Sequence, residues 1–165
     1  MNAHAVALSL AVSALLLASP QQASAGEQSR LNSEITGLRL ATAGFHSLPD
    51  AIDAGWSEDL TGCLALPGVG GMGHHYINWD LFFDGEVDAL QPELLVYAPT
   101  PNGGLRLAAV EYLVFDSALT GPVPELYGQT FHFNPNIQAW VLHVWLWHGN
   151  PNGLFADWNP TVSCD

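Results

Sequence analysis

Apolar residues recur every three or four positions in the first polar stretch of the chain, GEQSRLNSEITGLRLATAGF. Leu31, Ile35 and Leu38 follow this spacing, which is the period of an amphipathic helix. Further along, Ser47 stands two residues before Pro49, in the order of an N-cap and a first helical turn. The N-terminal part of the chain is therefore expected to form a pair of helices, of which the second is short.

Glycine and proline divide the rest of the chain into runs with the composition of β-strands. The clearest runs after Cys63 are GMGHHYIN, ELLVYAP, LRLAAVEYLVF and WVLHVWLW. Asn102-Gly103 joins the second run to the third and favours a hairpin turn, and NPNG after the last run favours a β-turn. Helices followed by antiparallel strands predict a single α+β domain over residues 26–165, with an open sheet, a small barrel or a sandwich as alternatives.

An apolar stretch at residues 6–18, VALSLAVSALLLA, precedes the A-x-A-like sequence Ala23-Ser24-Ala25. This order predicts a signal peptide over residues 1–25, although its first residues contain no lysine or arginine. The apolar stretch is shorter than the roughly 20 residues that a membrane-spanning helix needs. The protein is therefore expected to be secreted or periplasmic, with no stable membrane insertion after processing.

Cys63 and Cys164 are the two cysteines of the sequence. An even pair in an oxidising compartment predicts one disulfide. The alternative, a pair of metal-binding thiolates, is less favoured because the two residues do not form a C-x-x-C motif. The expected bond would close a loop of about 100 residues, for which the chain-entropy estimate is about 4 to 5 kcal/mol.

Acidic residues outnumber basic ones by 16 to 3, and the formal net charge is −13. A surface this negative repels phosphate backbones and anionic headgroups, so nucleic acids and acidic membranes are poor candidate partners. Cations are better candidates, although acidity also serves solubility without any ligand. Small molecules or metal ions are therefore the expected partners.

Alternation along the predicted strands gives each ionisable group a face. Glu111 shares its face with the leucines of LRLAAVEYLVF, and His143 shares its face with Trp145 and Trp147. A buried carboxylate without a partner costs several kcal/mol, so both groups require one. With His75 from a third run, they form a set of two imidazoles and one carboxylate. Such a set suits Zn²⁺, Fe²⁺ or Cu²⁺ and leaves positions open for water or a substrate.

Further residues are candidates for the same site. His46 and His74 are candidate fourth ligands or outer partners of the ligands, and an adjoining pocket is expected to be walled by Trp145, Trp147 and Tyr76. Two alternatives stay open: a metal-free pocket for a small organic molecule, or a purely structural network within a tryptophan-filled core. Enzymatic use is also left open. Two histidines beside turn-like sequence are expected to be exposed, namely His132 and His148.

The sequence contains neither of two common catalytic motifs, the phosphate-binding loop and the serine-hydrolase motif. GVGGMG lacks the lysine of a phosphate-binding loop, so it is expected to be a flexible approach to the first strand-like run. No G-x-S-x-G motif occurs, which disfavours a serine hydrolase. A carboxylate pair for glycoside hydrolysis, Glu111 with Glu93 or Asp157, is conceivable, but the sequence gives no measure of the separation.

Five stretches carry a resemblance: AIDAGW, GMGHHYIN, PELLVYAP, LRLAAVEYLVF and LHVWLWHGNPNGLFADWNPTVSC. Together they resemble a family of small, uncharacterised exported bacterial proteins, over nearly all of the chain after residue 25. The resemblance implies a single secreted domain that includes His75, Glu111 and His143, and it implies no activity or cofactor. The order of these three residues also loosely resembles the cupin metal site. Cupin histidines stand two residues apart, whereas His74 and His75 are adjacent.

Overall fold

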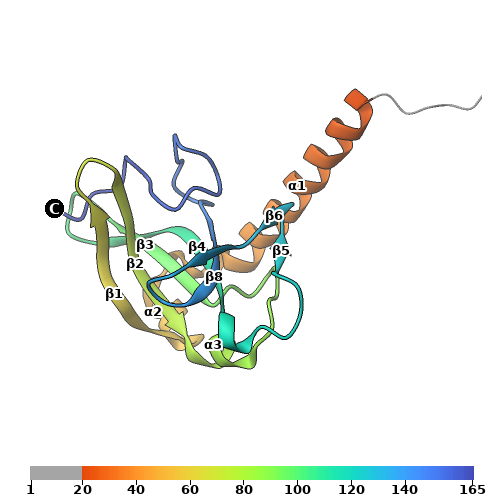
Figure 1. The fold of residues 1–165 in the computed structure, drawn as a ribbon. Coiled ribbons are helices and arrows are strands. Elements are labelled where there is room, and N and C mark those ends of the chain that lie inside the picture. The colour runs from red at the N-terminus through yellow and green to blue at the C-terminus, as the bar shows by residue number, and fades with distance from the viewer. Residues whose placement is uncertain (1–19) are drawn as a thin grey trace, which may run out of the picture.

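The computed structural model describes residues 20–165, which form helices packed against one six-stranded sheet (Figure 1). The helical elements are α1 (Pro20–Thr42), the 3-10 helix η1 (Ala43–His46), α2 (Leu48–Asp53), α3 (Trp79–Asp84) and the 3-10 helix η2 (Asp116–Ala118). The strands are β1 (Trp56–Leu66), β2 (Gly70–Asn78), β3 (Leu94–Pro99), β4 (Leu105–Phe115), β5 (Glu125–Leu126), β6 (Gln129–Thr130), β7 (His132–Asn134) and β8 (Ala139–Val144). The apolar stretch of the predicted signal peptide, residues 6–18, lies outside the described residues.

The large sheet has the strand order β1-β2-β3-β4-β8-β7, and every neighbouring pair is antiparallel. The predicted hairpin around Asn102-Gly103 joins β3 to β4, with the Gly103 N–H donating to the Thr100 carbonyl. The α+β class is therefore confirmed. The barrel alternative is wrong, because β1 and β7 stand at opposite ends of the strand order and do not pair with each other within residues 20–165.

One face of the sheet is covered by the helices. Ile35 and Leu38, two of the residues at helical spacing in α1, are buried together with Ala51 of α2. The short helix α2 begins after Ser47, whose hydroxyl accepts a hydrogen bond from the Asp50 N–H. These apolar residues pack against alternate side chains of the strands, among them Leu95, Tyr97, Val110, Tyr112, Leu142 and Val144. The main core therefore lies between the sheet and the helices.

The opposite face of the sheet carries two smaller apolar clusters. One includes Ala109 and Trp145, covered by Val162 from the C-terminal segment, and the other includes Leu113 and Val141. Two positions on the same face lie between these clusters. They are residue 111 of β4, two residues after Ala109, and residue 143 of β8, two residues before Trp145. The ionisable residues predicted from the sequence occupy those positions.

Glycines are required where β2 is approached closely by other backbone. A Cβ at Gly70 would lie 2.3 Å from the Asn159 carbonyl oxygen, and one at Gly73 would lie 2.5 Å from the Tyr97 carbonyl oxygen. Both residues also have positive φ angles, 134° and 108°, which favour glycine. The glycines were expected to precede the strand, but Gly70 and Gly73 belong to β2 itself and pack against the C-terminal segment and β3.

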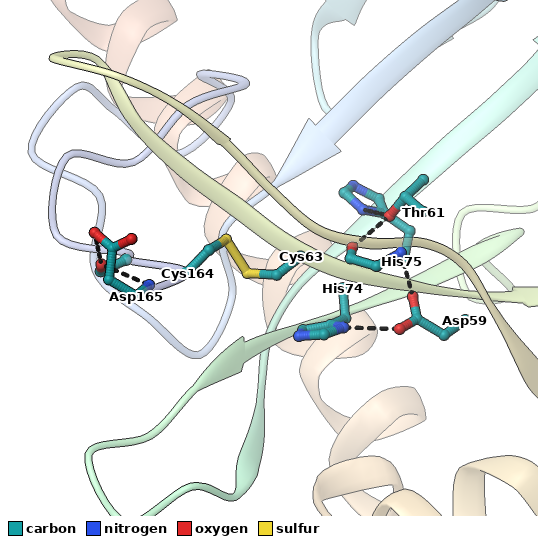
Figure 2. Close-up of a disulfide and its surroundings, with 9 residues drawn as sticks. Asp59, Thr61, Cys63, His74, His75, Cys164 and Asp165 are labelled. Atoms are coloured by element: carbon teal, nitrogen blue, oxygen red, sulfur yellow. Dashed lines mark hydrogen bonds and ion pairs between the residues drawn. A yellow bond between two sulfur atoms is a disulfide. The ribbon is translucent and has the colours of Figure 1, made fainter.

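Cys63 of β1 forms a disulfide with Cys164, with a Cα–Cα distance of 5.7 Å (Figure 2). The bond joins residues 101 positions apart and ties the C-terminal segment to the outermost strand of the sheet. Because a long loop is closed, the unfolded chain loses much conformational freedom, and the native state gains stability relative to it.

Reduction of this disulfide should lower the thermal stability. The chain-entropy estimate of about 4 to 5 kcal/mol corresponds to a fall in Tm of about 10 °C or more for a domain of this size. Melting curves with and without reductant, after thiol exposure has been verified, measure the effect. A Cys63→Ala, Cys164→Ala double variant is the control, since its melting curve should not respond to reductant. An unchanged wild-type melting temperature would contradict the prediction.

Candidate functional site

Three strands, β2, β4 and β8, bring His75, Glu111 and His143 to the same face of the sheet. The β4–β8 register places Glu111 directly opposite His143, and His75 projects from β2, two strands away from β4. His75 Nε2 lies 3.5 Å from Glu111 Oε2, and the ring centroids of His75 and His143 are 6.1 Å apart. We call these three residues the buried cluster.

Burial determines the charge of the cluster. The relative exposures of His75, Glu111 and His143 are 2%, 7% and 1%. Desolvation raises the pKa of Glu111 to about 8 and lowers the pKa of His75 to about 4. Desolvation also lowers the pKa of His143 well below its usual value. At neutral pH the cluster therefore consists of a protonated carboxyl group and two neutral imidazoles, so the contact between His75 and Glu111 is not an ion pair.

Nearby charges modify these pKa values. The negative charge of Asp157 adds to the rise at Glu111, and the charge of Asp59 partly opposes the fall at His75. For His143, the neighbouring histidines His75 and His132 act in the same direction as burial. The cluster thus lies within the electrostatic reach of carboxylates from β1 and from the C-terminal segment.

A bulge in β1 supplies a hydrogen-bond partner for His75. Asp59 is opposite Tyr76 and Cys63 is opposite His74 in the register, so three residues of β1 face His75 alone. This irregularity turns Thr61 toward the cluster, where its Oγ1 lies 3.1 Å from His75 Nδ1 (Figure 2). The position of the His75 ring is therefore fixed from outside the cluster.

His143 has no such partner. Neither of its ring nitrogens is hydrogen-bonded to any of the described residues, although both are buried. Its ring packs against Trp145, with centroids 4.8 Å apart. A neutral imidazole has one donor and one acceptor, and each polar group buried without a partner costs about 1 to 3 kcal/mol. His143 is therefore the group in the cluster with the greatest unmet demand for a ligand.

The cluster is not yet in the geometry of a metal centre. Within residues 20–165, no three or more His, Cys, Asp and Glu side chains are arranged to hold a metal ion. Two imidazoles that share a tetrahedral Zn²⁺ have ring centroids about 5 Å apart, so His75 and His143 would have to approach by about 1 Å to share an ion. The donor types suit such an ion, but its coordination requires the side chains to rearrange from these positions.

The two other histidines predicted for the site do not join the cluster. His74 is adjacent to His75 on β2 and therefore points to the other face of the strand. Its Nδ1 lies 2.7 Å from Asp59 Oδ2 (Figure 2). His46 is exposed and packs edge-on against Trp147, with centroids 4.4 Å apart. A direct role for His46 or His74 as a fourth ligand is thus not supported by their placement.

Of the three predicted wall residues, the structure places only Trp145 beside the cluster. Tyr76 packs against Tyr97, and Trp147 also joins the helix-side core. Trp147 leaves the predicted face because β8 ends at Val144, after which strand alternation no longer applies. A surface hollow of about 620 Å³ lies elsewhere, beside the β1–β2 turn and residues 160–165, and none of the cluster residues lines it.

Two residues near the cluster, His132 and Asp157, were not among the predicted ligands, although Asp157 was considered as a carboxylate partner of Glu111. His132 on β7 is opposite Val141 and so shares a face with His143, and its Nε2 lies 3.2 Å from Asp157 Oδ2. The side chains of this pair are 48% and 37% exposed, so it connects the cluster region with solvent. The sequence carries no signal for this, because β7 is only three residues long and Asp157 belongs to an irregular segment.

No family model matches the chain, and comparisons with curated proteins and with solved structures find no match. Among the described helices, none combines the length and apolar character needed to cross a membrane.

The raised pKa of Glu111 predicts a loss of stability at alkaline pH. A carboxyl group whose pKa is higher in the folded than in the unfolded state contributes to the free energy of unfolding. This contribution is complete at pH values below the unfolded pKa, and it is lost as the pH rises through the folded pKa, which is about 8 for Glu111. Burial also raises the pKa of Glu93 to about 8. The lowered histidine pKa values oppose this trend only below pH 6.5. From pH 6.5 to 8 each carboxyl should therefore cost about 1.5 kcal/mol of stability.

A Glu111→Gln variant tests this expectation, because the amide keeps the shape of the side chain but does not ionise. Urea denaturation of chelator-treated protein at pH 6.5 and 8 should show about half of the wild-type loss of stability. Glu125→Gln makes the same change at an exposed residue and should retain the wild-type loss. If Glu111→Gln retained it too, the buried carboxyl would not be the cause.

Proposed function

We propose that the protein is exported and binds a divalent transition metal ion, Zn²⁺, Fe²⁺ or Cu²⁺, at the buried cluster of His75, Glu111 and His143. The observation that carries this proposal is the pair of buried ring nitrogens of His143 without a partner among the described residues. A metal ion accepts an electron pair from the unprotonated nitrogen of a neutral imidazole, and two such imidazoles are available.

The electrostatic surroundings of the cluster support a cation rather than an anion. Binding of a divalent ion would displace the proton of Glu111, and the resulting carboxylate would neutralise part of the charge of the ion. Asp59 and Asp157 add negative potential at the margins, and the protein as a whole has a formal charge of −13. An anionic ligand would meet repulsion from both sources.

The disulfide supports the exported location. Bonds between cysteines persist in oxidising compartments and are rare in the cytosol, and Cys63 is bonded to Cys164 in the structure. This agrees with the signal peptide predicted from residues 1–25.

A second candidate function is the binding of a small organic molecule without metal. One observation favours it, because the cluster is not pre-arranged as a metal centre. Glu111 as a neutral acid and His143 as a neutral imidazole together offer both donors and acceptors of hydrogen bonds. A ligand with complementary polar groups could satisfy His143 without any approach of His75.

Elemental analysis separates these functions. Protein exported natively and purified without a chelator or a metal-affinity column should contain about one equivalent of Zn, Fe or Cu per chain. His143→Ala should lose the metal because one of three ligands is removed, whereas the control His46→Ala should keep it because His46 is exposed and outside the cluster. A metal content below about a tenth of an equivalent in the wild type would contradict metal binding.

Trp145 provides a measurement for the second candidate, because its ring contacts His143. A change in tryptophan fluorescence on addition of a small molecule, retained in strong chelator and lost in His143→Ala, would support a metal-free pocket. If His143→Ala changed only the melting temperature, and neither metal content nor ligand response, the cluster would be a structural network.

A further inference from the structure

The hydroxyl of Thr61 makes two contacts, which together determine where its proton lies. Thr61 Oγ1 lies 2.8 Å from the carbonyl oxygen of the next residue, Gly62, and 3.1 Å from His75 Nδ1. A carbonyl oxygen has no proton to give, so the hydroxyl must donate to Gly62. The single hydroxyl proton is then used, and Oγ1 can only accept a hydrogen bond from His75.

The opposite arrangement is disfavoured on both sides of the ring. If Thr61 donated to Nδ1, its oxygen would face the Gly62 carbonyl oxygen at 2.8 Å with no proton between them. His75 would then carry its proton on Nε2, which faces Glu111 Oε2 at 3.5 Å. That separation is longer than a normal N–H···O hydrogen bond, so the proton on Nε2 would gain little there.

From these contacts we infer that Thr61 is a positioning residue, which holds neutral His75 with its proton on Nδ1 and thereby directs the lone pair of Nε2 into the buried cluster. The inference rests on the proposed function only for its second part, that this lone pair receives a metal ion. The bulge in β1 makes the arrangement possible, because three residues of β1 face His75 and one of them, Thr61, reaches its ring.

This assignment specifies the ligand that the cluster is prepared to take. With Nδ1 occupied by Thr61, His75 offers the cluster an electron pair and no proton. The matching ligand is an electron-pair acceptor, such as a divalent transition metal ion, or a hydrogen-bond donor, and the proposed function selects the metal ion. Histidines that bind metals commonly donate their other N–H to a fixed acceptor, which sets the tautomer and the ring orientation, and Thr61 occupies that place.

The tautomer can be measured directly in chelator-treated protein, without any metal. Long-range ¹H–¹⁵N correlation spectra at pH 7, with the His75 signals assigned by their loss in a His75→Asn variant, should show a protonated Nδ1 and an unprotonated Nε2. Thr61→Ser keeps the hydroxyl and should retain this pattern. Thr61→Val keeps the shape but removes the acceptor, so the Nε2-protonated form should become populated. Thr130→Val makes the same change on β6 and should have no effect.

Zinc titration of the same variants tests the second part. Thr61→Val should bind zinc about 10 to 100 times more weakly than the wild type, while Thr61→Ser and Thr130→Val should bind with wild-type affinity. A wild-type His75 protonated on Nε2 would overturn the inference, as would a Thr61→Val variant with unchanged tautomer and affinity. If the wild type showed the expected tautomer but bound no zinc, the proposed function would fail and the positioning role of Thr61 would stand.

Discussion

The pairing of β4 with β8 is the constraint on which the candidate site depends. It places Glu111 opposite His143 on the sheet face opposite to the one that α1 and α2 cover. On that face the neighbours along each strand are apolar, because one apolar cluster precedes these positions and another follows them. Because β4 is also paired with β3, a shift of the β4–β8 register by one residue would turn the side chains of β8 over, moving His143 to the opposite face and away from Glu111. The same apolar packing that fixes the register therefore holds the polar groups in place.

Two opposing requirements meet in the buried cluster. Desolvation keeps its members uncharged, which lets the sheet fold without isolated buried charges. Neutral groups still require hydrogen bonds, and the protein meets this need unevenly. His75 has Thr61, and the buried Glu93 accepts a hydrogen bond from the Leu113 N–H at 3.0 Å. His143 has no partner among the described residues. This imbalance distinguishes the cluster from an ordinary core network, in which buried polar groups are almost always paired.

Hydrophobic periodicity was sufficient to predict the α+β class, and the Asn102-Gly103 turn was sufficient to predict the β3–β4 hairpin, because both follow from local spacing. Alternation assigned Glu111 and His143 to faces of their own strands, but their meeting depends on the β4–β8 register. The disulfide followed from the cysteine count. The sequence did not predict β1, since a strand at the sheet edge with most side chains exposed lacks clear alternation. Without β1 there was no means to find Thr61, whose contact depends on a bulge. Trp147 was misplaced because alternation was extended beyond the end of β8, where the backbone bends to bond with Ala108. These errors come from edges and irregular backbone, which tertiary contacts determine.

The disulfide also has a consequence for the order in which the molecule is completed during synthesis. Strands β2 to β8 all lie between Cys63 and Cys164 in the chain. The bond can therefore close only after every one of these strands has left the ribosome. Cys63 directly follows the β1 bulge that contains Thr61, so the covalent anchor of that bulge forms only after strands β2 to β8 have been made. Until then, β1 is held by its pairing with β2 alone among the described strands, and a newly made chain acquires the locked form of this edge strand only after Cys164 has joined Cys63.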